Sequence, residues 1–68
     1  MTFREDLIGA LKRKYEAEID LKRIEGEILL QHAIGEPNQT NFTIAFDLIV
    51  EQIAHIQNKI HALKTNFK

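Results

Sequence analysis

A stripe of apolar residues in the second half of the chain constrains the fold more than any other sequence feature. The pattern is that of a helix packed lengthwise along other helices, and it fits the two-residue alternation of a strand poorly. We therefore predict a long helix over residues 42–66. The stripe repeats at alternating spacings of four and three residues and consists of Phe42, Phe46, Ile49, Ile53, Ile56, Ile60, Leu63 and Phe67.

A short segment interrupts the helical pattern over residues 35–41. Gly35 suits the left-handed position that follows a helix end, and Pro37 cannot continue a helix. Thr40 and Asn41 can each cap the helix that follows, because their side-chain oxygens accept bonds from its unpaired amides. These signals predict a turn between two helices.

The first helix has a recognisable start. Thr2 and Glu5 match a capping box, and no proline follows before the turn. We predict a helix over about residues 3–34. A short turn makes the two helices antiparallel neighbours, so the chain is expected to form one all-α domain over residues 1–68, a two-helix antiparallel hairpin.

The first helix carries two apolar sets. The set with the four-three spacing is expected to face the second helix, and its alanines would receive the larger side chains opposite. It consists of Phe3, Leu7, Ala10, Lys14, Ala17, Leu21, Ile24, Ile28 and Gln31. A second set, Ile8, Leu11, Tyr15 and Ile19, lies to one side of the first. Together the two sets cover well over half of the helix circumference, which is more than one partner helix can cover.

A hairpin of this kind is expected to need a partner. A chain of 68 residues is at the small end for a single core, and without cysteine it has no disulfides to stabilise it. Pairing two hairpins into a dimeric four-helix bundle buries the lateral set as well as the stripes. The predicted association interface consists of Ile8, Leu11, Tyr15, Ile19, Phe46, Ile49, Ile53, Ile56 and Ile60.

The charges are segregated between the two ends of the predicted hairpin. The half that holds the chain termini has seven basic and three acidic residues, and the half that holds the turn has two basic and seven acidic residues. Two such rods attract each other when they lie side by side in opposite directions, although salt screens the attraction over about 8 Å. We therefore predict an antiparallel homodimer of hairpins, a coiled-coil module for self-association and protein interaction.

The chain offers little of the chemistry that an active site needs. It contains no serine, no cysteine and no glycine-rich phosphate-binding motif. His55 and His61 lie on different faces of a helix, and Glu51 with His55 is interpreted as a surface pair. We predict a protein that is not an enzyme and that uses no cofactor or metal.

Two alternative functions remain open. Lys12, Arg13 and Lys14 form a basic run with possible phosphate contacts, which would suit a small nucleic-acid-binding regulator. Neighbouring acidic residues and the scarcity of aromatic residues for stacking make nucleic acid the less favoured partner. The other alternative is an adaptor or co-chaperone subunit that packs on a helix of a different protein.

The sequence also carries expectations about location. Its apolar runs are far shorter than the roughly 20 residues that a membrane span needs. Glu5 and Asp6 stand where a secretory signal has basic and then apolar residues. With 44% hydrophobic and 28% charged residues, the composition is that of a folded chain with a polar surface. We expect a cytoplasmic protein with no membrane association.

Overall fold

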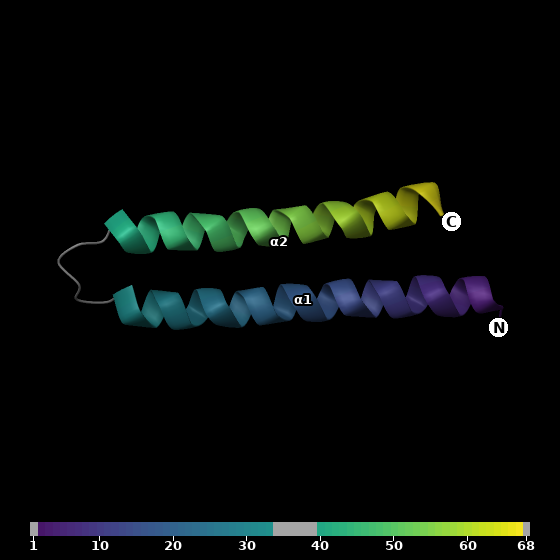
Figure 1. The fold of residues 1–68 in the computed structure, drawn as a ribbon, viewed down its shortest axis with the longest axis horizontal. Coiled ribbons are helices and arrows are strands. Elements are labelled where there is room, and N and C mark those ends of the chain that lie inside the picture. The colour runs from purple at the N-terminus through teal and green to yellow at the C-terminus, as the bar shows by residue number, and fades with distance from the viewer. Residues whose placement is uncertain (1, 34–39, 68) are drawn as a thin grey trace.

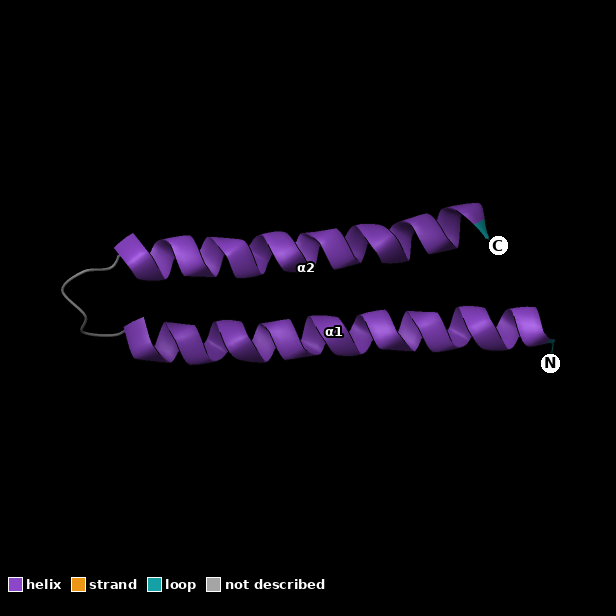
Figure 2. Cartoon of the chain, in the orientation of Figure 1, coloured by secondary structure: helices purple, strands orange, loops and turns teal. Residues whose placement is uncertain are grey.

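The computed structural model describes residues 2–33 and 40–67 of the chain. Two helices, α1 (Phe3–Ala33) and α2 (Thr40–Asn66), lie side by side and run in opposite directions (Figure 1). Both are continuous, and the two chain ends lie at the same end of the molecule (Figure 2). The hairpin measures 55 × 17 × 9 Å. The prediction of an all-helical chain with two helices packed against each other is confirmed.

The helix bounds differ slightly from those expected from the sequence. The first helix extends over Phe3–Ala33, up to the last residue described before the turn, and the predicted end at residue 34 lies outside the described residues. The second helix begins at Thr40, two residues before the predicted start. Such differences are within the usual scatter at helix ends. The predicted roles of Gly35 and Pro37 in the turn, and of the Thr40 side chain as a cap, lie outside the described residues.

Hydrogen bonds cap the start of α1 and the end of α2. At the start of α1, the Glu5 amide donates to Thr2 Oγ1 over 3.1 Å, and the Asp6 amide donates to the Thr2 carbonyl over 3.0 Å. Thr2 is therefore the helix cap that the sequence predicted, and the two carboxylates lie at the favourable, positive end of the helix dipole. At the end of α2, Asn66 Nδ2 donates to the Ala62 carbonyl over 2.8 Å.

The apolar stripe of α2 faces α1, as its spacing predicted. Ile56, at its centre, is 6% exposed and is the one buried hydrophobic side chain among the described residues. The other members that face α1 are half-buried, because two cylinders in contact along a line shield each side chain on one side only. These half-buried members are Phe42, Phe46, Ile49, Ile53, Ile60 and Leu63.

The face that α1 presents to α2 is not the predicted one. The lateral set, rather than the long stripe, lies against α2, and the prediction that Leu21, Ile24 and Ile28 pack opposite the centre of α2 is wrong within the hairpin. Over residues 8–19, the lateral set supplies four large side chains, where the long stripe has two alanines and a lysine. The buried and half-buried residues along this face are Ile8, Leu11, Tyr15, Glu18, Ile19, Lys22, Gly26, Leu29 and Ala33.

Gly26 explains the same choice of face in the other half of the hairpin. It is buried, and a Cβ placed on it would lie 3.3 Å from Phe46 Cε1 and 3.6 Å from Ile49 Cγ2. The phenylalanine ring and the isoleucine thus pack against bare backbone, at a place where a Cβ would already be in tight contact with the ring and a long side chain would need the helices to move apart. The cost of a glycine inside a helix, about 1 kcal/mol relative to alanine, is offset by this close approach.

A matched pair of glycine substitutions tests that packing. Gly26→Leu and Gly9→Leu gain similar helix propensity, but a Cβ at Gly9 meets only the mobile guanidinium end of Arg13, at 3.3 Å. We expect Gly9→Leu to raise the thermal midpoint and Gly26→Leu to be less stable than it by about 1–3 kcal/mol, the usual cost of overpacking. Equal melting curves for the two variants would show that Gly26 is not a packing site.

A second pair tests the apolar contact between the helices. Ile53 is half-buried against α1, whereas Ile44 on the same helix is 65% exposed. Ile53→Asp places a charge in the apolar contact and should cost about 3–5 kcal/mol, enough to abolish helicity and association together. Ile44→Asp, near the start of α2, should leave the circular dichroism spectrum unchanged. A helical, associated Ile53→Asp variant would contradict the assignment.

Candidate association surface

The candidate functional site is the long apolar stripe of α1, which the hairpin leaves uncovered. Its five large side chains are between 50% and 81% exposed. Ala10, Lys14 and Ala17 continue the stripe between them and are also exposed. The five large members are Phe3, Leu7, Leu21, Ile24 and Ile28. A row of this length and regularity is typical of a surface that another helix covers.

The stripe and the face that contacts α2 point in different directions. At about 100° per residue, the stripe is centred roughly 130° around α1 from the centre of the contact face. A helix docked on the stripe would therefore lie on the far side of α1 from α2. The directions from the axis of α1 to that helix and to α2 would form an obtuse angle. Both faces belong to one helix with one period, so α1 is able to pack along two neighbours at once.

The groove between the two helices on the side nearer the stripe is polar in its middle section and mainly apolar toward the turn. The middle section is lined by six charged or amide side chains together with Leu48, Ala54, His55 and Ile56. Those polar residues are Glu18, Lys22, Glu51, Gln52, Asn58 and Lys59. Covering this section with an apolar helix would remove charges from water without giving them partners, which is costly. The middle section is therefore a poor docking surface compared with the stripe itself.

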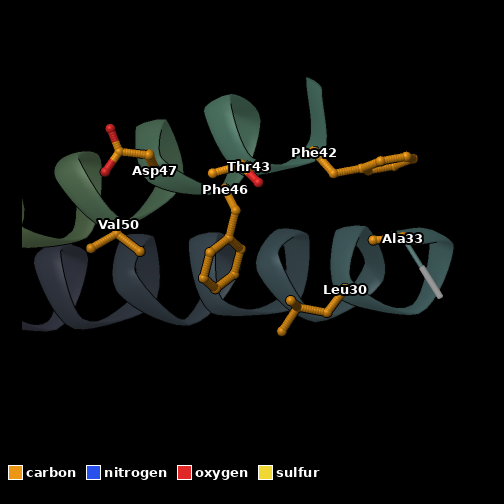
Figure 3. Close-up of a pocket in the computed structure, with 7 residues that line it drawn as sticks. All are labelled: Leu30, Ala33, Phe42, Thr43, Phe46, Asp47 and Val50. Carbon is orange, nitrogen blue, oxygen red and sulfur yellow. The ribbon is translucent and has the colours of Figure 1, made fainter. Parts of the chain in front are cut away.

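A second apolar surface lies at the turn end of the hairpin (Figure 3). It is an open groove of about 510 Å³. The ring of Phe46 reaches across to α1, while Phe42 points toward the end of the hairpin. The groove is lined by Leu30, Ala33, Phe42, Thr43, Phe46, Asp47 and Val50. With one hydroxyl and one carboxylate on its walls, it lacks the convergent polar groups that fix a small molecule.

Ion pairs lie on the exposed surface of α1. Lys22 pairs with Glu25 over 3.2 Å, and Arg23 pairs with Asp20 over 3.3 Å. Both are pairs within α1 at a spacing of three residues, and pairs of this kind contribute little to stability in water. Among the described residues, no group of three or more histidine, cysteine or acidic side chains could hold a metal ion.

One cation contact does join the helices. The ammonium of Lys59 on α2 lies 5.6 Å from the centre of the Tyr15 ring on α1, a distance at which the ring attracts a cation. The sequence pattern does not predict this contact between Lys59 and Tyr15, because the contact depends on the relative rotation of the helices. It fixes Tyr15 toward α2 rather than toward an outside partner.

The basic run proposed for phosphate contacts lies near the end of the hairpin that holds the termini. Lys12, Arg13 and Lys14 are exposed. Because successive helix residues are about 100° apart, their charges spread around α1 instead of gathering on one face. Lys14 belongs to the apolar stripe, which leaves it on the surface where a partner helix would lie.

The predicted association residues come together, but within one chain. Ile8, Leu11, Tyr15 and Ile19 lie on the α2-facing side of α1, and their counterparts on α2 lie on the side that faces α1. The surface that remains is the stripe that was expected to be inside. Within the hairpin, the lateral set takes the place against α2 that the long stripe was expected to take. Gly26 was the signal that could have decided between them, because a glycine on one face of a long helix allows close approach there.

Comparisons with known proteins add no family to this picture. No family model matches the sequence, and no curated protein or solved structure is significantly similar to it. Within the described part of the chain, neither helix combines the length and hydropathy needed to cross a membrane.

Proposed function

We propose that this protein is a non-enzymatic association module in which the hairpin pairs with a second copy of itself through the apolar stripe of α1. The observation that carries the proposal is the uncovered stripe, with its five large side chains at least half exposed beside a hairpin interior that fully buries so little. Hydrophobic burial is the main favourable term in both folding and association. Folding of one chain leaves many large apolar side chains exposed, so a partner can bury them.

The exposed area supports the same conclusion. A compact protein of 7.9 kDa exposes roughly 4,400 Å² by the usual scaling with mass. The hairpin exposes 5512 Å², an excess of about 1,100 Å² over that scaling. A standard protein interface buries about 800 Å² on each partner, so the excess is more than enough for one partner of a dimer to cover.

The charge distribution favours a second copy running in the opposite direction. The hairpin places both termini, and with them most of the basic residues, at one end, while the acidic residues predominate at the other (Figure 1). Two copies in opposite directions bring basic ends beside acidic ends, which favours this orientation and speeds encounter. We propose on this basis an antiparallel dimer of hairpins that contains four helices.

Sedimentation equilibrium of the full chain, measured over a range of concentrations, tests the proposal. We expect twice the mass of one chain, and a thermal midpoint that rises with protein concentration, because a dimer is stabilised by mass action. A folded chain that stays at the mass of one copy at the highest concentration would refute self-association. A poorly ordered or aggregating chain would instead favour the alternative, a subunit that folds on a different protein.

A further inference from the structure

We infer that the second copy binds antiparallel to α1, so that the two copies of α1 form the centre of the dimer and each α2 lies outside. The inference rests on the proposed self-association and adds its surface, direction and register. The symmetry axis passes between Lys14 and Ala17. The four helices then form a bent layer, in the order α2, α1, α1, α2, rather than a closed square.

The stripe is complementary to itself in this register. The stripe consists of two alternating sets of positions, because its spacing alternates between four and three residues. In an antiparallel pair of helices, each layer of the contact joins a residue of one set on one copy to a residue of the other set on the second copy. In the register proposed here, the two residue numbers in every layer add to 31. Every large side chain of one copy then meets an apolar side chain of the other. The layers are Phe3 with Ile28, Leu7 with Ile24, Ala10 with Leu21, and Lys14 with Ala17, each occurring twice. All of these residues are exposed in the hairpin and available for the contact.

The register also accommodates the one charged residue in the stripe. Lys14 meets Ala17 of the second copy, whose small side chain leaves room for the methylene stem to pass over it while the ammonium reaches water. In a parallel pair, Lys14 would meet Lys14, placing two like charges in one layer of an apolar seam. The lysine thus selects the antiparallel direction.

Charges beside the seam favour the same register. Arg13 lies opposite Asp20 of the second copy, and Arg4 lies opposite Glu25, each pair occurring twice. These two carboxylates also pair with Arg23 and Lys22 of their own chain, so each would contact two cations. Asp6 opposite Glu27 is the one like-charge pair along the seam. Sliding one helix by a heptad, so that layer positions add to 38, would instead oppose Glu18 with Glu18 and Asp20 with Asp20. Like charges at close range disfavour that register.

The polar middle section of the groove disfavours a closed square. In a square bundle, the residues between the α2 face and the stripe would point to the common centre. On α1 these include Glu18 and Glu25, and on α2 Gln52 and Lys59, which line the grooves on that side. The bent layer leaves all four at the surface in contact with water.

A matched pair of substitutions locates the surface. Ile24 and Ile44 are exposed to a similar degree, 56% and 65%, on α1 and α2 respectively. Ile24→Glu should weaken the dimer by about 100-fold or more in sedimentation, with helicity retained, because it places a charge in the seam. Ile44→Glu should leave the dimer dissociation constant within a few-fold. Equal effects of the two substitutions would overturn the assignment of the surface to α1.

Disulfide trapping then tests direction and register in a chain that has no cysteine of its own. Three single variants, Ala10→Cys, Leu21→Cys and Ile28→Cys, change exposed positions. We expect an oxidised mixture of the first two to give a mixed disulfide dimer, since the two cysteines share a layer. Each variant oxidised alone, and the mixture of the first with the third, should stay unlinked.

The other outcomes are each decisive. Self-linking of Ala10→Cys or Leu21→Cys alone would show a parallel dimer, and linking of Ala10→Cys with Ile28→Cys would show the shifted register. Absence of any link in a chain that sediments as a dimer would show a different surface. All three overturn this inference and leave self-association standing. A monomer in sedimentation overturns the proposed function, and the inference with it.

Discussion

Two helices in contact along a single line cannot cover an apolar surface that spans more than half of one of them. This geometric limit governs the whole molecule. The described part of the hairpin buries one hydrophobic side chain, Ile56, and leaves the rest of its contact residues partly in water. The hairpin therefore leaves much of its apolar surface in water, and in the proposed dimer the energetics of folding and of association are linked.

Within that limit, the rotation of α1 about its own axis decides which surface is used inside the chain. Gly26 allows Phe46 and Ile49 to approach the backbone of α1, and Tyr15 accepts the ammonium of Lys59 across the helices. Both contacts hold the lateral set against α2. The long stripe is turned outward as a consequence, with its lysine kept out of the intrachain contact. The rotation of α1 that packs the hairpin thus also exposes the stripe proposed as the association surface.

In the proposed dimer, the polar and charged residues give the association surface its specificity. Apolar stripes alone would bind any amphipathic helix, and direction comes from where the charges lie. In the proposed dimer, Lys14 and the arginines near the start of α1 meet small or acidic positions near its middle and end. The same residues that were candidates for phosphate contacts serve in this arrangement to select the orientation of a second copy.

The amino-acid sequence by itself determined the two helices, the break between them, the inward stripe of α2 and the surplus of apolar surface, because spacing and capping are local properties. It could not determine which apolar set of α1 faces α2. Both sets repeat with the same helical period, so periodicity cannot distinguish between them. Which set faces α2 depends on how the side chains of α2 fit against each of them. Only the tertiary structure, through the close approach at Gly26, decided it.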